Sequence, residues 1–176
     1  RLDPRGVELD DGVPVGVGVR LQRAPLGDGV LPFHALGGEI AALDVSSALS
    51  VQGVAESILA RHDRVDILVN SAGLNHPQRF WRNQTVASWD QVVRVNLDGT
   101  FYCTHAVLPS MRTRKDGLVI NISSWAGKYT LAMAGAAYNG SKHAVVALTE
   151  TINMEECVNG IRACAICPAE VATPIL

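Results

Sequence analysis

The chain contains 176 residues, of which 48% are hydrophobic and 18% are charged, and its formal net charge at pH 7 is -2. The length corresponds to one domain, and the weak net charge gives no reason to expect a nucleic acid or an anionic membrane as a partner. The sequence has no long apolar run, and it begins without a basic segment followed by an apolar one. We therefore expect no membrane span, no secretory signal and a cytoplasmic protein.

Two regions differ in their hydrophobic pattern. Residues 1–37 are rich in glycine, proline and valine, and their periodicity is poor. From residue 38 onward, short apolar runs alternate with segments of helical period. The expected elements are a strand at Glu39–Val45, a helix at Ser47–Arg61, a strand at Val65–Asn70, a helix from Thr85 to about Met111, a strand at Leu118–Ser123, a helix at about Ala137–Val158 and a strand at Ile161–Cys167.

This alternation predicts βαβ units in an α/β fold, with a doubly wound, Rossmann-type parallel sheet and helices on both faces. We expect a single domain that is incomplete at both ends. Residues 38–176 would form its core, and residues 1–37 a divergent or degenerate nucleotide-binding segment. Because parallel strands end at the same edge of a sheet, Asn70, Ser124 and Pro168 should face a common crevice.

Tyr138 and Lys142 are four residues apart in a predicted helix. Positions at this spacing share a helix face, so the phenol and the ammonium group would project into the same space. A nearby positive charge favours the phenolate form of a tyrosine, which suits the side chain to general acid and base catalysis. The spacing also occurs on ordinary exposed helices. The strand that ends at Ser123 and Ser124 is what favours the catalytic interpretation.

The cysteines and histidines give no metal site. Cys164 and Cys167 have a spacing typical of redox or metal sites, but they lie in a predicted strand. Side chains three apart on a strand point to opposite faces, so the two sulfurs would not share a metal or a disulfide. The five histidines are scattered singly, without ligand spacing.

Four motifs resemble, in order, those of the short-chain dehydrogenase/reductase family. They are an Asn-Ala-Gly-type turn (Asn70, Ala72, Gly73), a helix asparagine (Asn96), a strand-end serine and the Tyr138–Lys142 pair. Ser71 stands where the family often has a second asparagine. A weaker fifth motif runs from Pro168 to Pro174, with Ala169 in place of the family's glycine. The resemblance covers roughly residue 38 to the C-terminus.

The resemblance implies an NAD(P)-dependent oxidoreductase that interconverts an alcohol and a ketone, of the 3-oxoacyl reductase or alcohol dehydrogenase type. Tyr138 would exchange a proton with the substrate oxygen, Lys142 would assist it and bind the nicotinamide ribose, and Ser124 would orient the substrate. The loop from Ser124 to Tyr138 is about one residue longer than expected, which leaves Ser123 as the alternative. Asn96 would kink its helix and hold a proton-relaying water, or it would be a core amide that caps a loop.

The resemblance also implies bound NAD or NADP, which the sequence does not distinguish. The expected cofactor-binding residues are Gly12, Gly16, Gly18, Asp44, Val45, Asn70, Ala72, Gly73, Tyr138, Lys142, Pro168, Val171 and Thr173. Asn70 also has a structural interpretation as a turn residue, and Asp44 one as part of a helix N-cap region.

The three N-terminal glycines reproduce the family's phosphate-binding spacing. However, Asp11 stands where the family usually has threonine, and Pro25 and Gly27 interrupt the helix that should follow. The segment is therefore either a phosphate-binding loop or a chance match among many glycines. Its mismatch with the family would reflect a divergent or partly deleted nucleotide half, or a shifted reading frame.

The expected partners are a small alcohol or ketone and further copies of the chain. The two long predicted helices carry more apolar surface than one side of a sheet needs, and in the family they pair across a dimer interface, so we expect a homodimer or homotetramer. Trp125 and Met133 are candidates for an apolar substrate wall. One rival is a non-catalytic fragment that acts as an interaction module. Another is an epimerase or dehydratase with the same Tyr-Lys pair, which the Asn-Ala-Gly-type turn and Asn96 disfavour.

Overall fold

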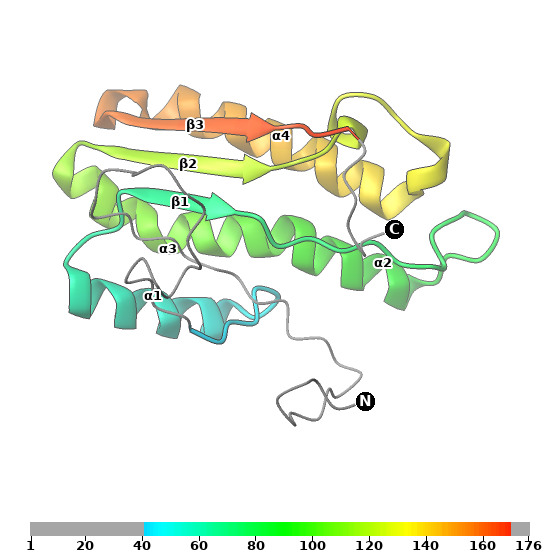
Figure 1. Cartoon of the computed structure of the whole chain (residues 1–176), viewed down its shortest axis with the longest axis horizontal. Helices are drawn as coiled ribbons and strands as arrows, with labels where there is room; N and C mark the ends of the chain where they lie inside the picture. The colour runs from blue at the N-terminus through cyan, green and yellow to red at the C-terminus, as the bar shows by residue number, and fades with distance from the viewer. Residues whose placement is uncertain (1–40, 170–176) are drawn as a thin grey trace, which may run out of the picture.

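A computed structural model of the protein describes residues 41–169. The predictions for Gly12, Gly16, Gly18, Val171 and Thr173 lie outside these residues. The described elements are α1 (Ala48–His62), β1 (Ile67–Asn70), α2 (Val86–Val93), the π-helix η2 (Arg94–Asp98), α3 (Gly99–Arg114), β2 (Gly117–Ile122), the 3-10 helices η3 (Trp125–Gly127) and η4 (Ala132–Ala134), α4 (Ala136–Glu156), the 3-10 helix η5 (Cys157–Asn159) and β3 (Ile161–Ile166) (Figure 1). None of the helices within residues 41–169 is long and apolar enough to cross a bilayer.

The three strands form a parallel sheet in the order β1-β2-β3. Ile67 of β1 lies opposite Leu118 of β2, and Val119 of β2 lies opposite Ala163 of β3. Because all three strands run in the same direction, their carboxyl ends meet at one edge of the sheet (Figure 1). The Rossmann-type α/β fold predicted from the sequence is confirmed.

The described helices cover one face of this sheet. Helices α3 and α4 pack directly against the strands, and α1 packs against α3 (Figure 1). Alternate residues of β2 are therefore buried, and Val119 and Met111 are fully inaccessible at 0% exposure. Gly117 permits this approach, because a Cβ at that position would lie 2.5 Å from Sδ of Met111. Burial of each such apolar side chain contributes about 1.5–3 kcal/mol to the free energy of unfolding.

The long helix predicted from Thr85 to Met111 is interrupted in the structure. Thr85 begins it with a capping box, in which its side chain accepts from the Ser88 N–H at 3.1 Å and Ser88 Oγ accepts from the Thr85 N–H at 3.0 Å. After α2, the five-residue π-helix η2 widens the turn before α3 continues the path. The family resemblance implies a kink at Asn96, and the π-helix includes that residue.

The strand predicted at Glu39–Val45 is not found in residues 41–45, which form no strand. Val45 is nevertheless only 2% exposed. Its side chain packs on α3, where a Cβ added to Gly99 would lie 3.0 Å from the Val45 Cβ. The apolar run therefore reflects a loop packed against a helix rather than pairing in a sheet.

Helix α1 begins at Ala48, with Ser47 as its N-cap. The Ser47 side chain accepts a hydrogen bond from the Ser50 N–H at 3.3 Å. Asp44 lies just before the cap and accepts from the Ser46 N–H at 2.9 Å. This turn fixes the direction in which the chain enters α1.

Candidate active site

The turn after β1 brings Gly73 against two side chains from other segments. A Cβ built at Gly73 would lie 3.3 Å from Nζ of Lys142 and 3.6 Å from Oδ1 of Asn96. Three motifs that are far apart in the sequence therefore meet beyond the carboxyl end of β1. Because glycine has no side chain, the turn can approach the lysine ammonium and the Asn96 amide this closely.

Tyr138 and Lys142 lie in the first turns of α4, with the lysine Nζ 5.6 Å from the centre of the tyrosine ring. Lys142 is 4% exposed, and its Nζ donates to the Ile122 carbonyl at 2.8 Å. Burial lowers the pKa of Lys142 from 10.5 to about 8, while nearby Cys167 acts in the opposite direction. The lysine is therefore mostly charged at pH 7 but titrates much closer to neutrality than a free lysine.

The two serines after β2 have different environments. Ser123 is 4% exposed, and its Oγ donates to the Lys142 carbonyl at 2.9 Å. Ser124 is half-buried, and its Oγ accepts from the Ala126 N–H at 3.1 Å, so its own hydrogen can still be donated. Ser124 therefore remains the candidate for contact with a substrate, whereas Ser123 anchors α4.

Asn96 uses its side-chain amide to hold neighbouring segments. Its Oδ1 accepts from the Leu74 N–H at 2.8 Å, and its Nδ2 donates to the Leu74 carbonyl at 3.0 Å and to Ser141 Oγ at 3.2 Å. The amide thus caps the loop after β1 and ties it to α4, one residue before Lys142. This is the structural role considered in the sequence analysis. The proton-relay role stays a prediction.

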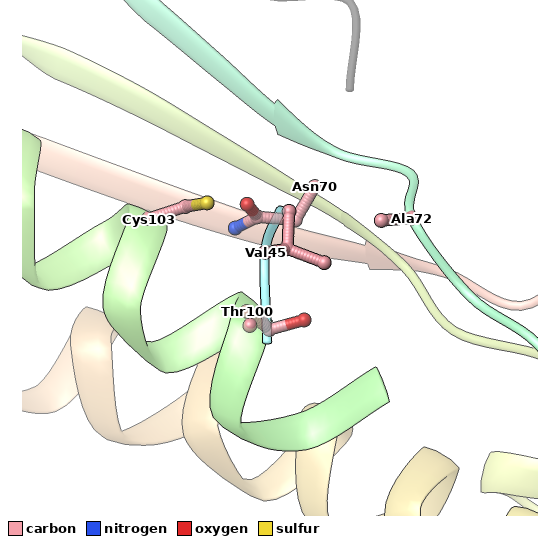
Figure 2. Close-up of a pocket in the computed structure, with 6 residues that line it drawn as sticks. Val45, Asn70, Ala72, Thr100 and Cys103 are labelled. Carbon is pink, nitrogen blue, oxygen red and sulfur yellow. The ribbon is translucent and has the colours of Figure 1, made fainter. Parts of the chain in front are cut away.

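Asn70 ends β1 and points into the protein core. It is 6% exposed, and its Nδ2 donates to Asn121 Oδ1 at 2.8 Å and to Thr104 Oγ1 at 3.1 Å. Figure 2 shows Asn70 beside a small pocket whose other labelled residues are Val45, Ala72, Thr100 and Cys103. Asn70 and Val45 therefore lie in the packed interior next to the carboxyl end of β1, where they help to hold the turn in place. Their contact with a cofactor stays a prediction, as does that of Ala72 and of the exposed Asp44.

A model of the short chain dehydrogenase family matches residues 33–176. The chain belongs to this family. The match includes the turn after β1, Asn96, Ser124 and the Tyr138–Lys142 pair, whereas Gly12, Gly16 and Gly18 precede the matched region.

Curated relatives share roughly three-quarters of this short-chain dehydrogenase chain. A protein of Streptomyces virginiae that is named as a ketoacyl reductase of the monensin polyketide synthase is 39% identical over 135 residues, which are 76% of this chain and 51% of the relative. The NAD(+)-dependent 2-dehydro-3-deoxy-L-rhamnonate dehydrogenase of Sphingomonas sp. is 36% identical over 137 residues, 78% of this chain and 55% of the relative. The chain therefore spans about half the length of these relatives.

Solved structures agree with this assignment. A metagenomic short-chain oxidoreductase in complex with NADP matches with a TM-score of 0.72 and 35% identity, over 78% of this chain and 63% of that one. A short-chain dehydrogenase from Streptomyces avermitilis matches with a TM-score of 0.74 and 32% identity, over 81% of this chain and 53% of that one.

The strand ends of this short-chain dehydrogenase fit a nicotinamide cofactor. An ammonium group has three hydrogens to donate, and among the described residues Lys142 Nζ donates one of them, to Ile122. The Gly73 turn lies against the same group without a side chain between them. Pro168 follows β3 and is held there by a 2.7 Å hydrogen bond from the Trp125 N–H to its carbonyl, which ties together the segments that follow β2 and β3.

The cysteines of the chain are free, and their environments differ. Cys103 is buried, and burial raises the pKa of its thiol to about 11. Cys164 is exposed on β3, and Cys167 is half-buried just beyond the end of this strand. Within residues 41–169, no group of three His, Cys, Asp or Glu side chains is placed to hold a metal ion.

Sequence reasoning missed the buried polar residues that support the site. Asn121 lies at the centre of them and is 0% exposed, and its Nδ2 donates to Thr149 Oγ1 on α4 at 2.8 Å. A signal was available, because an amide on the buried face of an apolar strand requires hydrogen-bonding partners. The sequence does not show which residues those partners are.

Proposed function

We propose that the chain is the core of an NAD(P)-dependent oxidoreductase that interconverts an alcohol and a ketone, with Tyr138 as the general acid and base. The observation that carries this proposal is the position of Lys142. Its ammonium group lies 5.6 Å from the centre of the Tyr138 ring and is buried against the Gly73 turn at the strand ends. An ion held in that place serves a proton transfer better than it serves stability, because burying it costs free energy.

In the direction of reduction, Tyr138 donates its phenolic proton to the carbonyl oxygen of the substrate, and in the direction of oxidation it accepts that proton from the alcohol. Lys142 places a cation 5.6 Å from the centre of the Tyr138 ring, and it largely retains its charge at pH 7 because its pKa is about 8. Ser124 donates a hydrogen bond to the same substrate oxygen and so orients the carbonyl carbon.

A nicotinamide cofactor, when bound, supplies or accepts the hydride. Lys142 would donate hydrogen bonds to its ribose, and Gly73 and Pro168 would border it. The relatives include one named for NAD(+), and the similar structures include one with NADP. They support use of a nicotinamide cofactor without selecting between the two forms.

The substrate is proposed to be a ketone or 3-oxoacyl compound with an apolar portion. Three exposed side chains follow Ser124 in the loop that leads to α4: Trp125, Tyr129 and Met133. The rings of Trp125 and Tyr129 pack together, with their centres 5.3 Å apart. Together they offer an apolar surface next to the candidate catalytic residues. The similarity to a protein named as a ketoacyl reductase agrees with this substrate class.

The proposal is tested by titrating the purified chain with NADH and with NADPH and following the cofactor fluorescence. We expect saturable binding of at least one of them. Oxidation of whichever reduced cofactor binds is then measured with an acetoacetyl thioester and with a simple cyclic ketone as substrates. Binding of neither cofactor would favour the non-catalytic fragment, which would act as an interaction module.

We also propose that the chain self-associates through α3 and α4. A groove of about 230 Å³ runs between these helices on the side away from the sheet, and Phe101, Leu108 and Ile152 contribute to its wall. Phe101 is 50% exposed, which leaves an aromatic ring available for a second copy. Sedimentation velocity would show a dimer or tetramer, and Phe101→Asp should shift it toward monomer. A monomeric parent would contradict the proposal.

A further inference from the structure

Three successive residues of β2 and its following turn attach α4 to the sheet through polar groups. Asn121 Nδ2 donates to Thr149 Oγ1 at 2.8 Å, and Lys142 Nζ donates to the Ile122 carbonyl at 2.8 Å. Ser123 Oγ donates to the Lys142 carbonyl at 2.9 Å. The helix that carries Tyr138 is therefore attached to β2 and its following turn at two levels, one at Lys142 and the other at Thr149. Farther along, Asn153 attaches it to β3, where its Nδ2 donates to the Ala163 carbonyl at 2.8 Å and its Oδ1 accepts from the Ala163 N–H at 2.7 Å.

The attachment at Thr149 has a fixed direction. Thr149 Oγ1 donates its only hydrogen to the Val145 carbonyl at 2.8 Å, so it can only accept from Asn121. The Asn121 Oδ1 is in turn the acceptor for Asn70 Nδ2 at 2.8 Å. Each group in this buried chain thus has a single compatible role, and the Asn121 amide cannot reverse without losing both partners.

The two levels are well spaced to hold a helix in register. Thr149 follows Lys142 by seven residues, which is two turns or roughly 10 Å along the helix axis. The two residues therefore lie on nearly the same face of α4, toward β2. Without Thr149, the face of α4 toward β2 would keep only the link at Lys142, and the next link would be the one from Asn153 to β3. Two separated links to β2 on one face resist both sliding and rotation of the helix against that strand.

From this geometry we propose that the hydrogen bond between Asn121 and Thr149 is a positioning device for the active site. It sets the place of α4 along β2, and so holds Lys142 and Tyr138 in register with Ser124. Asn121 and Thr149 touch neither substrate nor cofactor in this account. The proposal rests on the proposed function for its catalytic consequence, but its structural part is independent of that function.

A stability role alone explains the pair less well. Both side chains are almost completely buried, with Asn121 0% and Thr149 4% exposed. A pair of apolar residues of the same shape would fill this space without the cost of removing two polar groups from water. What an apolar pair cannot supply is direction, because dispersion contacts permit small shifts along the helix that an oriented hydrogen bond opposes.

The chain offers a matched control for this hydrogen bond. Thr149 and Thr151 are both on α4, and each donates to the carbonyl four residues earlier, Thr151 to Ala147 at 2.9 Å. Of these two threonines, only Thr149 accepts a hydrogen bond from the sheet, since Thr151 is exposed. Replacing each by valine removes the same hydroxyl and keeps the same shape.

The first readout is turnover. We expect Thr149→Val to lower kcat by about tenfold or more while KM changes by less than about twofold, because a misplaced proton donor slows chemistry more than binding. Thr149→Ser keeps the acceptor and should restore kcat to within about threefold of the parent. Thr151→Val should behave as the parent does. Equal losses in the two valine variants would overturn the proposal.

The second readout requires neither cofactor nor substrate. The chain has three lysines, Lys115, Lys128 and Lys142, and only Lys142 is buried. Carbon-13 labelling at lysine Cε therefore gives three signals whose titration is followed by NMR, with Lys142→Met to assign the third. The groups that face Lys142 are Cys167 and Tyr138. We expect Thr149→Val to shift the titration of Lys142 by about half a pH unit or more toward that of an exposed lysine, with no shift in Thr151→Val.

The two readouts separate the proposals. If Thr149→Val shifts the titration of Lys142 while the parent protein shows no turnover, the positioning role is supported and the proposed function is not. A loss of kcat without that shift would overturn the positioning role, because Lys142 would not have moved. If Thr149→Val does not fold, Thr149→Cys serves in its place. A thiol is a weaker acceptor of similar size, and changes in the same direction but smaller are expected.

Discussion

At the scale of residues, the site depends on an ammonium group held away from water. Lys142 is 4% exposed, and its pKa falls from 10.5 to about 8 through burial. Between these two pH values the unfolded chain binds a proton that the folded chain has already lost. The contribution of Lys142 to the free energy of unfolding must therefore rise with pH in this window.

This linkage gives a prediction for Lys142→Met. Relative to the variant, the free energy of unfolding of the parent should rise by up to about 3 kcal/mol as the pH is raised from 8 to 10.5. Urea denaturation at a series of pH values measures the difference. Lys128→Met, at an exposed lysine, should show no comparable rise. If the difference in free energy of unfolding between the parent and Lys142→Met stays constant from pH 8 to 10.5, the ammonium is not buried as described.

Several residue roles could be predicted from the sequence because they depend on local spacing. Tyr138 and Lys142 are close together since a helix places residues four apart on one face. The division of roles between Ser123 and Ser124 could not be predicted, because consecutive residues in extended chain both remain compatible with a site until the neighbouring helix is placed. The hydrogen bond from Ser123 to the Lys142 carbonyl decides between them.

At the scale of elements, α4 begins in a backbone conformation that only glycine adopts readily. Gly135 has a φ of 78°, and a Cβ there would lie 2.3 Å from the Arg79 carbonyl oxygen. That carbonyl accepts from the Ala136 N–H at 3.4 Å, so the loop before α2 approaches the start of α4. The turn at Gly135 therefore sets the direction in which the helix leaves towards Tyr138.

Gly135→Ala should accordingly destabilise the protein by about 2 kcal/mol or more, through the left-handed φ together with the clash. Gly53 offers the opposite case, because a Cβ there meets nothing within 4 Å on the exposed side of α1. Gly53→Ala should stabilise by about 0.5–1 kcal/mol, the difference in helix propensity. Thermal unfolding of both variants measures this contrast. Effects of the same sign at both positions would contradict it.

The elements were predictable where one periodicity extends through a segment, as in α1, α4 and the three strands. The interruption of the helix from Thr85 was predicted only as a kink, because an extra residue in one turn changes the apolar spacing very little. The expected strand at Glu39–Val45 was wrong for residues 41–45, since burial against α3 gives the same apolar run as burial in a sheet. Only the packing of Val45 on Gly99 shows which of the two applies.

At the scale of the whole molecule, the two sheet-covering helices are joined by an ion pair between buried Glu156 and half-exposed Arg112. Glu156 of α4 is 5% exposed and accepts from Arg112 Nε of α3 at 2.9 Å. Asn159 also donates to it, at 2.9 Å. These partners lower the pKa of Glu156, chiefly through the hydrogen bond from Arg112.

Glu156→Gln should therefore reduce the free energy of unfolding at pH 7 by about 1–3 kcal/mol, because the Arg112 guanidinium loses a charged acceptor. A carboxyl whose pKa is depressed in the folded state stabilises it above the unfolded pKa of about 4.3, and this contribution disappears as the pH falls further. The difference in free energy of unfolding between the parent and Glu156→Gln should thus become smaller below that pH. Glu155→Gln, at the exposed neighbour, is the control. A gap that widens in acid would contradict the account.

The fold class was predictable at this scale because alternating strands and helices admit few parallel arrangements. The buried links between elements were not, since each joins residues far apart in the chain. Asn121 and Thr149 are separated by 28 positions, and Arg112 and Glu156 by 44. No spacing rule connects such pairs, and only the packed structure shows them.

The central claim is that Tyr138 moves the proton, and the most direct measurement is single-turnover oxidation of bound NADH or NADPH by a ketone in Tyr138→Phe. We expect the rate to fall by about a hundredfold or more, the range for loss of a general acid, with cofactor affinity within about threefold of the parent. A Tyr138→Phe variant that oxidises the cofactor at a rate close to that of the parent would contradict the claim.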